Sequence, residues 1–262
     1  MTEKYGLIEE QQEQPNFPVR NLLRVPHQGA SLVVSRNAFG PDWFNTNVEE
    51  MNGSFSYPNT WKVISFREPT TAESISAIAY QFTQIAKPEI LDSRWLQAGR
   101  VLRAGEGVWA NMPKDTQGKP IIDEAELKTY LQGVEPVKVN KGNVYIVPNK
   151  EGVRDLGYAE YGSFEQGVQE SATFAQGGLA RILEHTEGVA SNLLAISSKD
   201  NYSRGVSVSY LDKSKKPLLR VVELGSDRVL GGNRLYVNGN YWSGYINGYA
   251  VGVLNESAEG AS

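Results

Sequence analysis

The chain of 262 residues has no cysteine, and this absence excludes disulfide bridges, cysteine-based zinc sites, iron–sulfur clusters and thiol nucleophiles. Its two histidines, His27 and His185, do not stand in a cluster with the spacing of metal ligands. The Gly-x-Ser-x-Gly motif and complete glycine-rich phosphate loops are also missing. The sequence therefore predicts a non-enzymatic protein with no catalytic residues, no metal and no cofactor.

Positive charge is not in excess either, because 26 Lys and Arg stand against 30 Asp and Glu, for a net charge of −4. Nucleic-acid affinity rests on clustered Lys and Arg, so we expect no nucleic-acid partner. The short basic run at 213–216 is interpreted as a solvated turn.

Long apolar runs are absent as well. No stretch approaches the roughly 20 apolar residues that span a bilayer, and no apolar run follows the first residues as in a secretory signal. We therefore expect no membrane insertion. The compartment stays open, and work in a virion or at a cell surface would require a route other than a signal peptide.

Residues 9–14 form a polar tract, and Pro15 and Pro18 follow it. Such a segment buries too little apolar area to order itself, which predicts a flexible arm over residues 1–20. Residues 21–262 are then expected to form a single domain. Strands are predicted near 19–25 and 31–35, and structured loops over 36–61.

The clearest helix is predicted from about 71 to 87, because Thr70 and Glu73 have the spacing of a capping box and Pro88 follows its end. Its apolar residues recur at helical spacing, which predicts one stripe packed against a core. The stripe consists of Ile75, Ile78, Ala79, Phe82, Ile85 and Ala86.

Two further helical regions are predicted, a short one over 123–132 and a long one over 163–198. In the long region Ser163 and Gln166 have capping-box spacing, and Gly177-Gly178 is expected to divide it. After residue 198 the pattern changes to short strands separated by turn residues. Helices followed by such strands predict an α+β fold, with helices packed on a turn-rich, mostly antiparallel sheet.

The segment 202–249 alternates apolar residues with Tyr, Ser, Asn, Asp and Lys, as in Gly205–Ser209 and Arg234–Asn238. A strand places alternate side chains on opposite faces, so the apolar set is expected to form a buried frame. The frame consists of Val206, Val208, Leu219, Val221, Val222, Leu224, Leu235, Val237, Ala250, Val251 and Val253.

The residues between the frame positions are those of antibody-type binding surfaces, where Tyr supplies rigid contact area and small polar residues adapt their hydrogen bonds. We therefore predict a ligand-binding cassette at about 200–250. Its predicted contact residues are Ser207, Ser209, Tyr210, Asp212, Lys213, Ser214, Lys215, Glu223, Asn233, Tyr236, Asn238, Asn240, Tyr241, Ser243, Tyr245 and Ile246.

The framework Arg204-Gly-Val-x-Val208, Leu224-Gly-Ser-Asp-Arg228, Leu235-x-Val237, Trp242 and Gly248–Leu254 resembles that of the variable proteins of diversity-generating retroelements, which include phage tropism determinants. The resemblance implies a C-type lectin-like fold and a hypervariable surface generated by retroelement mutagenesis. It also implies a protein or glycan ligand on a target cell. The calcium-binding Glu-Pro-Asn and Gln-Pro-Asp tripeptides of sugar-binding relatives are absent, so calcium-dependent sugar binding is not implied.

Two alternatives stay open at this point. The chain could be a structural virion or assembly protein that uses the Tyr-rich surface as a permanent subunit interface, although obligate interfaces are usually more hydrophobic. It could also be an enzyme acting on glycans, which would require two carboxylates about 5 to 10 Å apart in a cleft.

Overall fold

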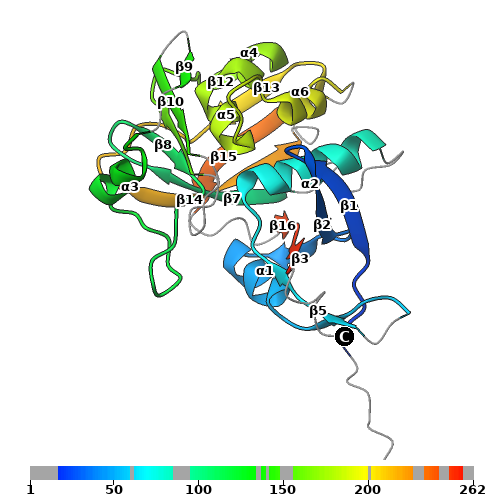
Figure 1. Cartoon of the computed structure of the whole chain (residues 1–262). Helices are drawn as coiled ribbons and strands as arrows, with labels where there is room; N and C mark the ends of the chain where they lie inside the picture. The colour runs from blue at the N-terminus through cyan, green and yellow to red at the C-terminus, as the bar shows by residue number, and fades with distance from the viewer. Residues whose placement is uncertain are drawn as a thin grey trace, which may run out of the picture.

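The computed structural model describes residues 17–59, 62–84, 95–133, 137–139, 142–147, 156–199, 202–226, 233–241 and 248–255 (Figure 1). Most of the predicted arm over 1–20 lies outside these residues. Its last two residues belong to the fold, because Val19 forms a β-bridge with Ser56 and an Arg20 Nη atom lies 2.6 Å from a Glu50 carboxylate oxygen.

The largest sheet runs in the order β12-β13-β15-β14-β7-β8-β11-β10-β9. Neighbours along this path are antiparallel except β13 and β15, which are parallel. This confirms the predicted α+β class with a mostly antiparallel sheet. The strands are β7 Trp95–Arg103, β8 Gly107–Ala110, β9 Val137–Val139, β10 Gly142–Ile146, β11 Gly157–Glu160, β12 Gly167–Gln169, β13 Val206–Ser209, β14 Leu218–Ser226 and β15 Leu235–Tyr241.

The two ends of the described chain meet in a smaller sheet of order β1-β2-β17-β6. It contains β1 (Leu22–His27) and β2 (Ala30–Ser35), which confirm the two strands predicted near the N-terminus, with β17 (Val253–Leu254) and β6 (Phe66–Arg67). Strand β16 (Gly248–Ala250) pairs with β7 of the large sheet and with β3.

The predicted loops over 36–61 contain regular structure instead: β3 (Phe39–Asp42), α1 (Phe44–Met51) and β4 (Phe55–Ser56), which pairs with β5 (Val63–Ile64). The prediction was wrong because these elements are short and their apolar residues follow no period. Phe39, Phe55 and Phe66 nevertheless pack edge to face, with ring centroids 5.5 to 5.7 Å apart.

Helix α2 (Thr71–Gln84) confirms the predicted capping box. The Glu73 carboxylate accepts from Thr70 N at 2.8 Å, and Glu73 N donates to Thr70 Oγ1 at 3.2 Å. The helix is buried nearly all round, so the prediction of one buried stripe underestimates its buried surface. Ile75 and Ile78 join the main core, whereas Ala77 on another side packs in the cluster of β1 and β2.

The long helical region predicted over 163–198 begins later and is broken into three helices, α4 (Ser171–Gln176), α5 (Gly178–Glu184) and α6 (Ser191–Ser197). The predicted division at Gly177-Gly178 is confirmed. The capping box at Ser163 is not, because the Gln166 side chain accepts a hydrogen bond from Leu211 N, and β12 follows before the first helix. The short predicted helix is confirmed as α3 (Glu124–Tyr130), where Asp123 accepts from Glu126 N at 2.8 Å.

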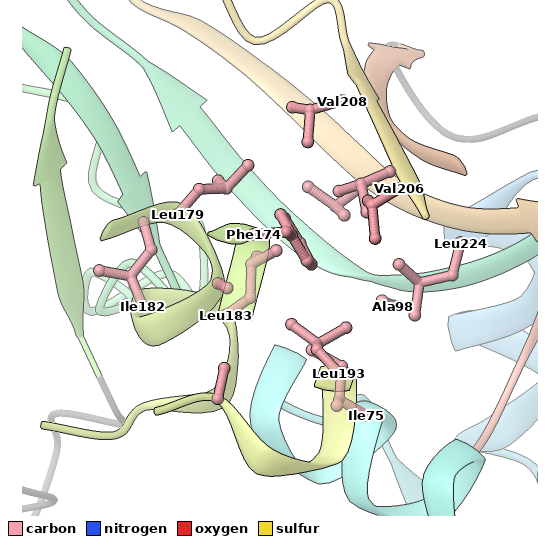
Figure 2. Close-up of a cluster of buried hydrophobic side chains, with 14 of the residues drawn as sticks. Ile75, Ala98, Phe174, Leu179, Ile182, Leu183, Leu193, Val206, Val208 and Leu224 are labelled. Atoms are coloured by element: carbon pink, nitrogen blue, oxygen red, sulfur yellow. The ribbon is translucent and has the colours of Figure 1, made fainter. Parts of the chain in front are cut away.

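Helices α2, α4, α5 and α6 cover one face of the large sheet. Figure 2 shows Phe174, Leu179, Leu183 and Leu193 of these helices directed toward strand residues such as Val206, Val208 and Leu224. The other face is covered by α3 at one end, where Leu127 packs with Leu102 and Trp109, and by α1 further along, where Phe44 packs with Val221.

Candidate ligand-binding face

The predicted frame is confirmed by burial. Ten of its eleven residues are no more than 2% exposed, and Leu219 is half-buried. The frame residues of β13 and β15 belong to the core beneath the helices. The polar residues between them must then lie on the opposite face of the sheet.

One row of side chains crosses this opposite face from the sheet edge inward. Val168 of β12 pairs with Ser207 of β13, Ser207 pairs with Tyr236 of β15, and Tyr236 pairs with Gly225 of β14. Paired residues place their side chains on the same face. Val168 is 60% exposed, Ser207 and Tyr236 are partly exposed, and Gly225 is buried, so the row is accessible from Val168 to Tyr236.

The row ends at Trp95 of β7. The Trp95 and Tyr236 rings lie edge to face, with centroids 6.3 Å apart. A glycine is needed between them, because a Cβ atom at Gly225 would lie 2.5 Å from the Trp95 ring. This packing holds the Tyr236 ring against the Trp95 ring and the sheet.

The turn after β13 presents Tyr210 outward. Its side chain is 52% exposed and its backbone has a left-handed φ of 57°. The next residue, Leu211, is fully buried. The turn is anchored further on, where the carbonyl oxygen of Asp212 accepts from Arg103 Nε at 3.0 Å and from Tyr161 Oη at 2.9 Å. Burial raises the pKa of Tyr161 to about 12, so this hydroxyl remains a donor at neutral pH.

The basic run at 213–216 is exposed at its lysines, as expected for a turn. Ser214 differs from this expectation: it is buried, and its hydroxyl donates to the carbonyl oxygen of Lys216 at 2.6 Å. It stabilises the turn from inside and does not face solvent. Asn233, Asp212, Lys213 and Lys215 are exposed as predicted.

A second row behind the first begins at the partly exposed Ser209 and is buried from Asn238 onward. Ser209 pairs with Asn238, Asn238 with Glu223, and Glu223 with Gln97. Glu223 is fully buried and Asn238 is 6% exposed, so the expectation that both belong to the exposed surface is corrected.

The cover over this second row comes from distant parts of the chain. Asn47 of α1 donates to Gln97 Oε1 at 2.8 Å and to the carbonyl oxygen of Gly248 at 3.1 Å. Gln97 in turn donates to the carbonyl oxygen of Asp42 at 3.0 Å. Strand alternation assigned the face of Glu223 and Asn238 correctly, but it contains no information on what packs above that face.

Five predicted contact residues fall outside the described structure. The side chains of Asn240 and Tyr241, and the whole of Ser243, Tyr245 and Ile246, lie there. The described part of the face thus consists of Val168, Ser207, Ser209, Tyr210, Tyr236 and Trp95, with Asp212, Lys213, Lys215 and Asn233 around it. We call the first six residues the binding face.

Val168 and Trp95 were not predicted as contact residues. Val168 lay inside a predicted helix, and the sequence pattern there contains no strand signal. The β7 region contains no regular alternation either, because Gln97 is buried together with its neighbours Leu96 and Ala98.

Among the described residues, no group of His, Asp and Glu side chains is arranged to hold a metal ion. None of the helices in the described part of the chain is long and apolar enough to cross a membrane.

Known family models and curated proteins contain no match to the chain. Among solved structures, one described as "Accommodation of massive sequence variation in Nanoarchaeota by the C-type lectin fold" is similar over 84% of this chain and 98% of that chain, with 14% identity and a TM-score of 0.49. Its description names the C-type lectin fold that the sequence resemblance predicts. A likeness at this level carries no inference about what the present chain binds.

Proposed function

We propose that this protein is a non-enzymatic ligand-binding protein whose binding face contacts a protein or glycan on a target cell. The observation that carries the proposal is the separation of the two sides of β13 and β15. The Val206, Val208, Leu235 and Val237 side chains are buried, while Ser207, Ser209 and Tyr236 between them reach the surface.

Such a separation lets the surface residues change without loss of the fold. Surface substitutions away from structural features usually alter stability by less than about 0.5 kcal/mol, whereas core truncations cost about 2–5 kcal/mol. Together with the framework motifs, this supports a C-type lectin-like variable protein whose binding face is diversified by a retroelement.

The composition of the binding face supports recognition rather than a permanent core. Tyr210 and Tyr236 offer large rigid rings, and Ser207 and Ser209 offer short hydroxyl groups between them. Interfaces that form and dissociate combine aromatic contact area with polar groups in this way.

Two display libraries on the full chain would test the proposal. The first randomises Ser207, Ser209, Tyr210 and Tyr236, and the second randomises Val206, Val208, Leu235 and Val237. We expect most members of the first library to fold and some to bind a model protein in selection. Most members of the second should fail to fold. Equal loss of folded protein in both libraries would contradict the separation.

The retroelement part of the proposal has its own test. Sequencing of the locus from many isolates should show substitutions concentrated in the codons for about 200–250, beside a reverse transcriptase gene. Variation spread evenly along the gene would exclude diversification by a retroelement, while the display result would still decide whether the face binds.

An assembly protein is the second candidate, and the exposed Val168 favours it. Val168 lies on β12, which is the last strand of the large sheet among the described residues, and an exposed apolar side chain on such a strand suits docking against another subunit. Sedimentation of the purified chain distinguishes the two functions. A stable oligomer that the Val168→Asp variant dissociates would favour assembly, and a monomer unaffected by that change would favour transient ligand binding.

A further inference from the structure

A second candidate site lies at the other end of the large sheet, around a row of three aromatic side chains. Trp109 of β8 pairs with Tyr158 of β11, and Tyr158 pairs with Tyr145 of β10. The ring centroids are 4.5 Å apart between Trp109 and Tyr158 and 5.8 Å apart between Tyr145 and Tyr158. The three rings therefore form one continuous aromatic surface.

The rings are inclined to each other rather than coplanar. The interplanar angle is 48° between Trp109 and Tyr158 and 46° between Tyr145 and Tyr158. Rings inclined in this way do not offer the single flat face on which a sugar ring stacks. Trp109 is fully buried and Tyr158 is 7% exposed, while Tyr145 is more open. The wall is therefore fixed at its base and accessible at Tyr145.

A pocket of about 340 Å³ lies against this wall. Its size is at the lower end of the range of small-molecule sites, roughly 300 to 1,000 Å³. Besides the three aromatic residues, the lining consists of Glu106, Lys128, Leu131, Gln132, Asn143 and Glu160.

The charged groups around the pocket are mostly acidic. Glu106 and Glu160 line it, and Glu124 of α3 lies beside it, where its carboxylate is 3.7 Å from Lys128 Nζ. Lys128 Nζ also lies 3.3 Å from a Glu106 carboxylate oxygen. Two of these carboxylates, those of Glu106 and Glu124, thus share one ammonium group, and Glu160 is not paired with it. Burial, and then the carboxylates of Glu106, Glu160 and Glu124, raise the pKa of Tyr158, which agrees with a negative potential at the wall.

The Glu160 carboxylate is already held in place. One of its oxygens accepts from Asn143 N at 3.2 Å and lies 3.5 Å from Asn143 Nδ2. It lies on the same face as Tyr158, two residues along β11, so its charge is placed beside the aromatic wall.

We propose that this pocket binds an organic cation, such as an alkylated ammonium or a guanidinium group. Aromatic faces attract such cations through their quadrupole, and a positioned carboxylate adds a direct charge. Tyr145 and the small exposed part of Tyr158 would contact the cationic group, with the Glu160 carboxylate beside them. The site is separate from the binding face and does not depend on its function.

Lys128 allows a direct test, because its ammonium group lines the pocket 3.3 Å from a Glu106 carboxylate oxygen, where it would neutralise that carboxylate and repel a cationic ligand. Its side chain is 50% exposed, so its removal should not disturb the fold. For a cationic ligand, Lys128→Gln should tighten binding and Glu160→Gln should weaken it. For a neutral sugar, neither change has a consistent electrostatic effect.

The experiment titrates the full chain with tetramethylammonium, with N-acetyl-arginine amide and with N-acetylglucosamine, by calorimetry and by NMR of the Trp109 indole. We expect both cations to bind. Glu160→Gln should weaken them about three- to tenfold and Lys128→Gln should tighten them about threefold. Tighter binding of the arginine derivative would identify a protein side chain as the source of the cation.

Two variants serve as controls. Glu187→Gln removes an exposed carboxylate near α5 and Tyr210→Ala removes an exposed ring of the binding face, so both should leave cation binding unchanged. Three results would overturn the proposal: neither cation binds the folded chain, the sugar binds in their place, or Glu187→Gln weakens cation binding as much as Glu160→Gln.

Discussion

The large sheet has one face turned away from α4–α6, and the two ends of this face differ in what covers them. Strand β14 contributes to both ends. Along β14, Leu219 packs in the cluster beneath α3 and Val221 packs beneath α1, whereas Glu223 lies in the buried polar row and Gly225 lies beside the Trp95 ring. These alternate residues of a single strand reach four different environments.

The difference arises from what covers the sheet. At the binding face, Val168 and Tyr210 are left exposed at an edge strand and a turn. At the other end, α3 packs on Trp109 through Leu127, which buries the base of the aromatic wall. The covered wall forms a pocket, while the side chains at the binding face form a broader exposed surface, which we propose contacts a larger partner. Local strand chemistry sets which side chains point outward, and the covering elements decide what they can bind.

The largest loss of stability is expected when a frame residue beneath the binding face is truncated. Leu235→Ala should lower the free energy of unfolding by about 2–5 kcal/mol, because the side chain is fully buried in the main core. Urea denaturation measures this change.

The neighbouring Tyr236→Ala serves as the matched control. It loses the edge-to-face contact with Trp95, which contributes about 0.5–1.5 kcal/mol, together with some surface burial. A loss as large as that of Leu235→Ala would show that Tyr236 belongs to the frame.

At the pocket end of the sheet, Gly107 faces the Tyr158 ring, so a larger residue at this position should disturb the pocket. A Cβ atom there would lie 2.6 Å from the Tyr158 ring and 2.4 Å from the carbonyl oxygen of Ala159. Gly107→Ala should therefore lower the free energy of unfolding by about 1–3 kcal/mol and displace the Tyr158 ring. Thermal unfolding and the ring resonances of Tyr158 report the two effects.

Gly105 provides the comparison for this substitution. A Cβ atom at Gly105 would meet a Glu124 carboxylate oxygen at 3.9 Å, an ordinary contact. We expect Gly105→Ala to leave the free energy of unfolding and the Tyr158 resonances nearly unchanged. Equal effects at both glycines would show that the ring does not depend on the space at Gly107.

On the helix-covered face of the sheet, the carboxyl group of Glu184 in α5 is buried, whereas the carboxyl groups of Glu106 and Glu160 at the pocket are at least partly exposed. Burial raises its pKa to about 7, although the N–H groups of Leu193 and Asn192 donate to it and oppose the rise. The folded protein therefore holds the Glu184 proton more tightly than the unfolded chain. The stabilisation from this group is complete below pH about 4.5 and is lost as the pH rises to about 7.

Glu184→Gln cannot ionise, and its single amide oxygen keeps an acceptor for one of the two N–H groups. Between pH 4.5 and pH 8 the free energy of unfolding of the wild type should fall by about 1–3 kcal/mol relative to that of the variant. Urea denaturation across this pH range measures it. Glu187→Gln, at an exposed carboxyl three residues later, should show no such trend; if it does, the pH dependence does not come from burial of Glu184.

Sequence reasoning succeeded where the physics is local. The Thr70–Glu73 capping box lies within four residues, and both of its hydrogen bonds form as predicted. The alternation of Val206, Ser207 and Val208 likewise depends only on strand geometry, and their burial follows it. These features needed no knowledge of the rest of the chain.

It failed where the deciding contact is distant. Ser163 and Gln166 have the same spacing as a capping box, yet Gln166 bonds to Leu211, 45 residues away. The burial of Glu223 belongs to a row that includes Gln97, which Asn47 of α1 covers. Strand β7 was missed because it is buried on both faces and contains a register irregularity, so its residues do not alternate regularly.

The smallest expected effect on stability, and the largest on recognition, belongs to Tyr210. Its ring is 52% exposed and its left-handed backbone is about equally unfavourable for Tyr and Ala, so Tyr210→Ala should change the free energy of unfolding by less than about 0.5 kcal/mol. Binding to a ligand identified on a glycan array or in a cell-surface protein panel should weaken at least about tenfold, as for an aromatic hot spot. Tyr57→Ala removes a ring of similar exposure, 38%, away from the binding face and should leave that affinity unchanged. Loss of affinity in both variants would mean that exposed tyrosines act without regard to position, whereas loss in Tyr210→Ala alone assigns recognition to the uncovered end of the sheet.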